Sequence, residues 1–421
     1  MKIGSRHLGE SELMLRSVRL ERFKAAFTPE PIDVSPFTVV IGRNGSGKST
    51  ILEALQWLDM AIRHDAVRAC ERYSGIHDLL NIRSRGPTTR YFKLTLNWGG
   101  KRLAGVDDVE AEYELRVNES VEGLPLIHSE KLEVHSKNRP TVSIIRTDKA
   151  GTSATPGVRR VFPEDRSRSR VFDEPDRLAL SRLAGGHDDD SLAHAMLEKI
   201  RSFWERAVFL RLSPQRLAQG SPSTRRSFEP LLDEEGQTLP ALLNELNSKQ
   251  KQALVEAIND ALPDVRNVLV SKSNSSREQN AYWSIKEKMP TGYAGTGSYE
   301  IPASMLSEGT RRLTAILALL IRRPPPSLLC IEEIENGLDP WTILGVLERL
   351  KSAPRRGSQI ILTSHSPWLL DNVELEAIRL VRRKGGNTRY SVFRSDSAVK
   401  AFMDSVPPGA RYVNLQEEES S

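Results

Sequence analysis

Apolar and polar residues follow strand and helix periods along the chain, and together they predict a mixed α/β fold. Near the N-terminus, LRSVRLERF alternates between apolar and polar positions, and FTVVIG over residues 37–42 is a short continuous apolar run. Both patterns are typical of strands, the second of a buried strand. Apolar residues then recur at helical spacing from about Ser49 to Ala66, which predicts an amphipathic helix.

The middle of the chain predicts more strands and helices. Alternating segments within residues 91–147 predict antiparallel strands, and two more strands are expected at 265–271 and 281–287. Helices are expected over 191–207 and 238–262. Between these helices, VFLRLSP predicts a short strand that runs into a turn.

The pattern becomes sharper after residue 307. SEGTRRLTAILALLI predicts a helix, which the prolines at 324–326 stop because proline lacks the N–H and clashes with the preceding turn. SLLCI over 327–331 and QIILTS over 359–364 predict two buried strands. AIRLVRRKGGNTRYSVF predicts a hairpin with its turn near Gly385 and Gly386.

Composition limits the class of protein. Apolar residues make up 38% of the 421 residues and charged residues 27%, and no run of 18 uninterrupted apolar residues occurs. We therefore expect a folded protein without a membrane span. The N-terminus shows neither an apolar signal core nor a cleavage pattern, so we expect a cytoplasmic location. The two cysteines, Cys70 and Cys330, form no CxxC pair, which excludes a disulfide framework and a cysteine-rich zinc site.

The strongest chemical motif is GRNGSGKS at residues 42–49, which matches GxxxxGK followed by Ser or Thr. An apolar strand precedes it and an amphipathic helix follows, so a chance glycine-rich turn is disfavoured. The backbone N–H groups and the helix N-terminus suit the phosphates of ATP, Lys48 suits the β- and γ-phosphates, and the Ser49 hydroxyl suits Mg²⁺. The residues expected to bind ATP here are Asn44, Gly45, Ser46, Gly47, Lys48, Ser49 and Thr50.

Two carboxylates follow the strand at 327–331. Glu332 is expected to hold Mg²⁺, and Glu333 is expected to orient the attacking water as the catalytic base. The usual residue at the first of these positions is Asp, and the longer Glu could change the geometry around the metal. An acidic surface loop after a core strand is the alternative interpretation.

Three shorter motifs surround this acidic pair. LSEGT at 306–310 resembles the LSGGQ-type signature of ABC ATPases, in which Ser307 and Gly309 would contact the γ-phosphate bound by another subunit. NGLDP resembles a D-loop with Asp339 at the dimer interface, and THS places His365 like a switch histidine that contacts the γ-phosphate. Ordinary helix caps at Ser307 and Asp339, and a polar surface role for His365, are the alternatives.

In this order, the motifs resemble the RecF/OLD/SMC branch of ABC ATPases. They are especially similar to the single-chain AAA family ATPases of bacterial phage defence and DNA repair. The resemblance covers roughly residues 15–65 and 300–395 well. It implies a P-loop head with an N-terminal antiparallel β-subdomain and a large α+β insertion, and ATP and Mg²⁺ as ligands. It also implies a homodimer or higher homo-oligomer that forms through the ATP sites. Gln56 lies on the P-loop helix, which is the wrong position for the Q-loop glutamine of these families.

The resemblance also divides the chain. Residues 1–66 are expected to form the first part of the ATPase head, and 67–300 the remaining β-subdomain strands and an insertion or lid. The second part of the head is expected over 301–395, followed by a polar tail over 396–421. No sustained heptad pattern occurs in the long insertion, so we expect a compact lid or arm that binds a partner or DNA.

Arginines in the insertion are candidates for contact with nucleic acid. Residues 148–190 are rich in Arg, Asp, Pro and Gly, which predicts a mobile loop, and its segment 159–177 could contact phosphate groups. Acidic residues interleave with these arginines, so a solvated loop is the alternative. Arg225 and Arg226 are a second candidate, and the net charge of +5 is compatible with either outcome.

These features predict an ATP-dependent switch that gates a DNA-related or antiviral partner. The chain ends 56 residues after His365, which is too short for the Toprim nuclease domain of OLD proteins. We therefore expect a separate nuclease or effector subunit as partner, with double-stranded DNA as a further candidate. The alternatives are a scaffold or sensor that binds ATP with little hydrolysis, and a transporter ATPase subunit.

Overall fold

The computed structural model divides into two compact units. The first contains residues 1–35, 40–204 and 376–401, and the second contains 36–39, 205–375 and 402–421. The structure describes residues 13–27, 30–86, 90–137, 139–161, 170–182, 192–226, 229–272, 280–289, 297–395 and 406–418. Among these residues, no helix is long and apolar enough to span a membrane.

Unit 1 contains an eight-stranded antiparallel sheet in the order β2-β1-β4-β5-β6-β7-β8-β9. Its strands are β1 (Met14–Glu21), β2 (Ile32–Asp33), β4 (Tyr91–Leu103), β5 (Val106–Glu119), β6 (Pro125–Ser136), β7 (Arg139–Lys149), β8 (Val158–Val161) and β9 (Arg170–Phe172). The antiparallel strands expected within 91–147 are confirmed. Within the loop expected over 148–190, residues 150–157 and 173–178 have no helix or strand, but the prediction is wrong for β8 and β9, which extend the sheet.

The helices of unit 1 are α1 (Lys48–Arg63), α2 (Ala66–Cys70) and α3 (Leu192–Glu205), with short 3₁₀ turns at Ile76–Asp78 and Ala179–Arg182. Aromatic side chains fill the core between helix and sheet: Trp57 of α1 meets Phe92 of β4 edge to face at 4.9 Å, and Phe92 meets Phe23 in the same way. All three side chains are fully buried, so they anchor the helix that follows the P-loop.

Strand β3 (Phe37–Gly42) contributes its first residues to unit 2 and its end to unit 1. In unit 1 it is followed in the sheet by β17 (Ile378–Lys384) and β18 (Asn387–Val392). The hairpin predicted around Gly385 and Gly386 is confirmed. Both glycines have positive φ angles, of 56° and 75°, as the tight turn of a two-residue hairpin requires.

Unit 2 is built on parallel strands. In order they are β10 (Val208–Leu210), β15 (Leu328–Ile331) and β16 (Gln359–Ser364), followed by the start of β3. The larger helices are α5 (Leu239–Glu245), α6 (Ser248–Asn259), α7 (Glu308–Ile321) and α8 (Pro340–Ser352), and the short ones are α4 (Pro214–Leu217) and α9 (Pro367–Leu370). Turns of 3₁₀ helix lie at Ala303–Met305, Ala353–Arg356 and Leu375–Ala377.

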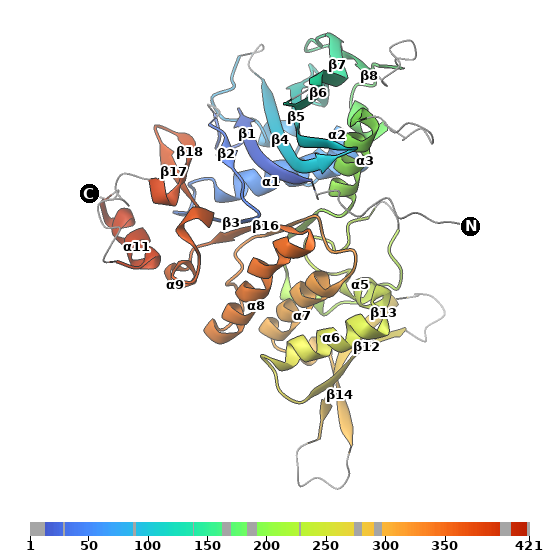
Figure 1. Cartoon of the computed structure of the whole chain (residues 1–421), viewed down its shortest axis with the longest axis vertical. Helices are drawn as coiled ribbons and strands as arrows, with labels where there is room; N and C mark the ends of the chain where they lie inside the picture. The colour runs from blue at the N-terminus through green and yellow to red at the C-terminus, as the bar shows by residue number, and fades with distance from the viewer. Residues whose placement is uncertain are drawn as a thin grey trace. The chain divides into compact units, whose positions relative to one another are not determined.

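A small antiparallel sheet completes unit 2. It contains β11 (Ser221–Pro222), β12 (Val265–Lys272), β13 (Asn280–Lys288) and β14 (Ser298–Pro302), and α6 packs on both β12 and α7 (Figure 1). The helix predicted over 238–262 is two helices, because Leu246 is extended and Asn247 starts α6 with a capping box.

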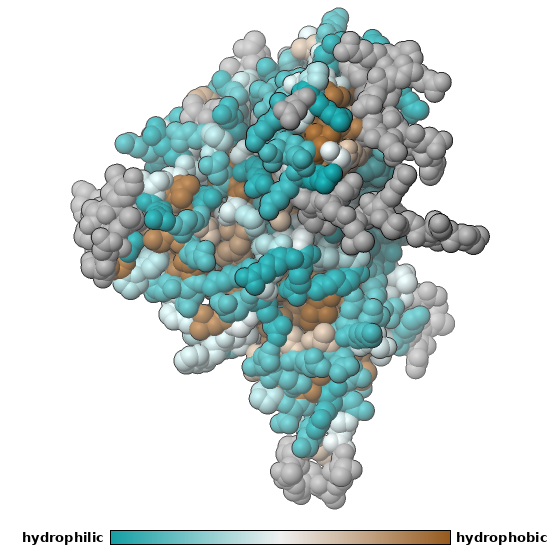
Figure 2. All heavy atoms as spheres, viewed as in Figure 1, coloured by the Kyte–Doolittle hydropathy of each residue, from teal (hydrophilic) through white to brown (hydrophobic). Residues whose placement is uncertain are grey.

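The end of the chain also differs from the prediction. A helix, α11 (Pro408–Glu418), occupies part of the expected polar tail, and Arg411 and Tyr412 are buried. It packs on α9, with the Gly409 N–H donating to Asp371 Oδ1 at 2.7 Å. Polar side chains cover most of the face seen in Figure 2, with small separate apolar patches, as is usual for protein surfaces.

Candidate functional site

The P-loop lies in unit 1, between the end of β3 and the start of α1. Gly47 is the N-cap of α1 with φ of 101°, which a residue with a side chain rarely adopts. A Cβ there would lie 2.5 Å from Thr388 Oγ1, and a Cβ at Gly42 would collide with the Val381 carbonyl oxygen. The Thr388 hydroxyl also donates to the Ser46 carbonyl oxygen at 2.9 Å. The hairpin β17–β18 therefore fixes the path of the loop.

The loop has the chemistry of an anion site. The N-terminus of α1 has no side-chain cap, and the partial positive charge of the helix at this end favours an anion. Ser46 Oγ is buried without a hydrogen-bond partner. The Lys48 ammonium donates to the carbonyl oxygens of Gly42 and Arg43, at 2.8 and 3.0 Å, so its charge lies over the loop backbone. These groups fit a polyphosphate.

A segment beside the P-loop was not among the predicted site residues. Ala25 lies next to Gly47, and its carbonyl oxygen accepts a hydrogen bond from the Thr388 N–H at 3.2 Å. The Phe27 ring follows, with the guanidinium groups of Arg22 and Arg83 at 5.0 and 5.3 Å from its centre. An aromatic ring with two cations beside a phosphate-binding loop can stack on a nucleobase. The sequence shows only RFKAAF, which carries no local signal for this role.

The acidic pair lies in unit 2 where β15 ends. The Glu332 N–H donates to the Leu210 carbonyl oxygen at 2.8 Å, and its carboxylate lies 3.8 Å from Arg211 Nε. Glu333 has a φ of 49°, which is uncommon for a non-glycine residue, and its N–H donates to Thr363 Oγ1 at 2.9 Å. Such backbone strain persists only where the surrounding contacts hold it, and it is frequent at functional sites.

Unit 2 brings Glu333 and His365 close together. His365 follows directly after β16, and its Nε2 atom lies 3.4 Å from Glu333 Oε1. The other carboxylate oxygen of Glu333 accepts a hydrogen bond from Asn336 Nδ2 at 2.6 Å. The His365 N–H donates to Glu335 Oε1 at 2.5 Å. Within the turn after β15, Asn336 therefore holds Glu333. Glu335 links the same turn to the end of β16.

Ser307 and Asp339 both cap helices. The Ser307 hydroxyl accepts a hydrogen bond from the Thr310 N–H at 3.1 Å, and Asp339 accepts from the N–H groups of Trp341 and Thr342 at 3.0 Å. Hydrogen bonds from Thr342, first from its hydroxyl, lower the pKa of Asp339 below its usual value. The alternative interpretation of Ser307 and Asp339 as helix caps is therefore confirmed. Their contact with nucleotide stays a prediction.

The start of α7 and the loop that contains Gly337 are also in contact. A Cβ at Gly309 would come within 2.7 Å of the Gly337 carbonyl oxygen, so the start of α7 packs directly on the loop before α8. Such a close approach needs a residue without a side chain. A side chain at position 309 would therefore displace the loop before α8.

One arginine in the Arg-rich segment cannot contact a phosphate group. Arg159 is fully buried, lies 3.4 Å from Glu130, and donates to the carbonyl oxygens of Glu174 and Arg177 at 2.5 and 2.6 Å. The predicted phosphate contact is wrong for this residue, because its guanidinium is buried inside unit 1 and bonded there to Glu130, Glu174 and Arg177. Residues 162–169 of the predicted segment lie outside the described part of the chain.

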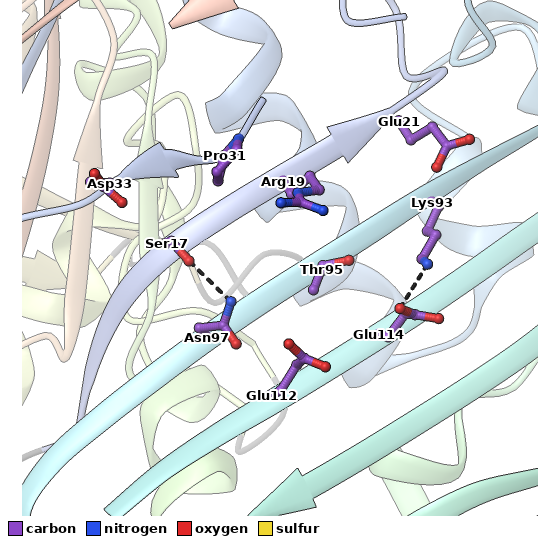
Figure 3. A pocket seen from close by; sticks show the side chains of 10 residues that line it. All are labelled: Ser17, Arg19, Glu21, Pro31, Asp33, Lys93, Thr95, Asn97, Glu112 and Glu114. Carbon is purple, nitrogen blue, oxygen red and sulfur yellow. Dashed lines mark hydrogen bonds and ion pairs between the residues drawn. The ribbon is translucent and has the colours of Figure 1, made fainter. Parts of the chain in front are cut away.

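A separate pocket of about 270 Å³ lies on the polar face of strands β1, β4 and β5 in unit 1 (Figure 3). Four carboxylates and two cations line it, and Lys93 is paired with Glu114 at 2.7 Å. This excess of negative charge disfavours a polyphosphate. Within the described residues, no group of three or more His, Cys, Asp or Glu side chains could hold a metal ion. Mg²⁺ often uses one or two protein ligands together with substrate phosphates, so it needs no such group.

Comparisons with known proteins agree with these motifs. A family model described as "AAA domain" matches residues 17–268, which is more than half of the chain. A second model, described as "AAA domain, putative AbiEii toxin, Type IV TA system", matches residues 197–371. No curated protein matches the chain significantly.

Two solved structures show the same fold. One is an Smc head bound to the C-terminal winged-helix domain of ScpA, with 16% identity, a TM-score of 0.53, and coverage of 90% of this chain and 97% of that chain. The other is an Smc head with an extended coiled coil bound to the C-terminal domain of ScpA, derived from Pyrococcus furiosus. It shows 14% identity and a TM-score of 0.50, with coverage of 97% and 100%. The expected fold, an ABC-type P-loop head with an antiparallel β-subdomain, is confirmed.

Proposed function

This chain belongs to the AAA-domain family of P-loop ATPases, and we propose that it binds ATP with Mg²⁺ and hydrolyses it as a switch that gates a partner. The observation that carries the proposal is the P-loop itself. It presents an uncapped helix N-terminus, a buried Ser46 hydroxyl without a partner, and the Lys48 ammonium on one short loop. Few ligands other than a polyphosphate satisfy all three.

The predicted residues have the following roles in this proposal, and Phe27 and Arg83 are added to them. The backbone of residues 44–50 and the Lys48 ammonium hold the phosphates, and Phe27 with Arg83 stacks on the base. Ser49 and Glu332 hold Mg²⁺, which would neutralise charge on the phosphates. Glu333 accepts the proton of the attacking water, and His365 contacts the terminal phosphate.

Dimerisation is the second part of the proposal. Ser307, Gly309 and Asp339 would contact nucleotide bound by a second copy of the chain. Exposed apolar side chains near these residues support this: Met305 is 78% exposed just before Ser307, and Trp341 is 82% exposed just after Asp339. The two side chains flank segments that contact each other at Gly309 and Gly337, and an exposed apolar patch can mark an interaction site.

The partner that the switch gates is a separate polypeptide, such as a nuclease or another effector of DNA repair or phage defence. The Smc heads of similar fold bind domains of a separate protein, ScpA, which makes a partner of this general kind reasonable. An ATP-binding scaffold with slow hydrolysis is the second candidate. It is favoured only by Glu332, which stands where Asp is usual.

ATP turnover by the purified chain tests the enzyme against the scaffold. The wild type should hydrolyse ATP, and Glu333→Gln should lower kcat by at least about 100-fold, because the amide cannot accept a proton from water. The same variant should accumulate an ATP-bound dimer in light scattering. A variant with unchanged turnover would remove Glu333 from the mechanism and favour the scaffold.

Adding double-stranded DNA to the same assay separates two kinds of trigger. Stimulation that disappears in Glu333→Gln indicates a switch that responds to DNA. Turnover that is indifferent to DNA indicates a protein trigger and directs the search to an effector.

A further inference from the structure

The carboxylate of Glu333 is held by Asn336, the first residue of the NGLDP motif, for which no role was predicted. Asn336 Nδ2 donates to Glu333 Oε2 at 2.6 Å, and the Asn336 N–H donates to the Glu333 carbonyl oxygen at 3.0 Å. The two residues therefore close a turn directly after β15, and this turn contains a side-chain link as well as a backbone link. A hydrogen bond from an amide to a charged carboxylate is stronger than one between neutral groups.

The backbone of Glu333 explains why such a link is needed. Its positive φ of 49° turns the side chain away from the direction that an extended strand would give. Thr363 Oγ1 accepts from the Glu333 N–H and fixes the backbone from the side of β16. Fixing the backbone leaves the side-chain torsions of Glu333 free, and at 42% exposure the carboxylate has little packing to restrict them.

The two oxygens of the carboxylate are distinguished by these contacts. Oε2 is engaged by the Asn336 amide, whereas Oε1 faces His365 Nε2 at 3.4 Å. A general base needs one oxygen directed at the water and the other held, because misdirection by about 1 Å can cost much of the rate. The geometry assigns Oε1 to the water and Oε2 to Asn336.

We propose that Asn336 is a positioning residue for ATP hydrolysis, which orients the Glu333 carboxylate without contacting ATP itself. The proposal rests on the proposed ATPase function. Asn336 thereby differs from Glu335, the preceding residue in the turn, whose carboxylate accepts a hydrogen bond from the His365 N–H and so holds the end of β16.

The test compares steady-state turnover and nucleotide binding in single variants. Asn336→Ala should lower kcat by about 10- to 100-fold, the range expected for the loss of a hydrogen bond to a charged group. The KM for ATP, the affinity for a non-hydrolysable ATP analogue and the thermal midpoint should stay close to wild type. Asn336→Asp keeps the shape but removes the donor, and it should lose at least as much activity.

Asn244→Ala is the matched control. The Asn244 side chain is also exposed, and its amide donates to a backbone carbonyl, that of Ser223, at 3.2 Å. This variant should keep wild-type kcat. If Asn336→Ala keeps wild-type kcat as well, or loses analogue binding in parallel with kcat, the proposal is overturned.

A double-mutant cycle separates positioning from a general structural effect. Glu333→Asp shortens the side chain and withdraws the carboxylate from the Asn336 amide. In that background Asn336→Ala should lower kcat by a clearly smaller factor than in the wild type, because the effects of substitutions at coupled residues are not additive. Equal costs in the two backgrounds would contradict the proposal, and a wild type without turnover would overturn both the proposal and the ATPase function.

Discussion

At the scale of single residues, the structure separates charges that hold the fold from charges that are available for chemistry. Glu130 is fully buried, and its carboxylate accepts hydrogen bonds from the Tyr113 hydroxyl and from the backbone N–H groups of Ala179 and Leu180. Its remaining partner is the buried Arg159. The alternation of β6 predicts that Glu130 lies in a strand, but no sequence pattern predicts that its partner comes from β8.

Glu130→Ala should lower the free energy of unfolding by about 3–5 kcal/mol, because it leaves the buried Arg159 charge without compensation. Urea unfolding followed by circular dichroism measures the change. Glu174→Ala is the control, since the pair of Glu174 with Arg177 is exposed and contributes at most about 1 kcal/mol. Equal losses in the two variants would mean that the buried pair contributes no more to the free energy of unfolding than the exposed pair.

At the scale of secondary-structure elements, the sequence predicted those elements that carry strong local signals. Asp339 with Pro340 predicted the start of α8, and the prolines after Arg323 predicted the end of α7. Strands β8 and β9 escaped prediction because they are short and contain arginines, and each is stabilised by its neighbour in the sheet, β8 by β7 and β9 by β8. The break between α5 and α6 depends on the cap at Asn247, which a continuous apolar pattern conceals.

Asn247→Ala should destabilise the protein by about 1 kcal/mol, because the side chain caps the Gln250 N–H and anchors a capping box. Chemical denaturation gives the value. Lys249→Ala in the first turn of the same helix keeps the box intact and should change stability by less than about 0.5 kcal/mol. A similar loss in both variants would show that the cap itself contributes little.

At the scale of the whole molecule, the chemistry was more predictable than the packing. The P-loop, the acidic pair and His365 are short motifs with fixed spacing, so their local structure follows from the chain itself. The ring of Phe27, the amide of Asn336 and the contact between Gly309 and Gly337 depend on distant segments or on exact torsion angles. Such features lie beyond what periodicity and motifs can predict.

The proposed dimer gives a prediction at this scale. Trp341→Ala should weaken ATP-dependent association of the Glu333→Gln protein by at least about tenfold, because an aromatic side chain at the centre of an interface often contributes more than 1 kcal/mol. Sedimentation or light scattering with ATP measures it, and binding of ATP by the monomer should be unchanged. Val121→Ser removes an equally exposed apolar side chain of unit 1 and should leave association intact. Undiminished association of the Trp341→Ala protein would place the interface elsewhere.

The two cysteines of the chain lie in the cores of the two units. Cys330 is fully buried in β15, and Cys70 is 4% exposed, with burial raising the pKa of its thiol to about 11. Thiolates are the reactive species, so both residues should react slowly with maleimides in the folded protein. A Met305→Cys variant would therefore carry one fast-reacting thiol on the wild-type background. A spin label or fluorophore attached there could report how far apart two copies lie as ATP is added and consumed.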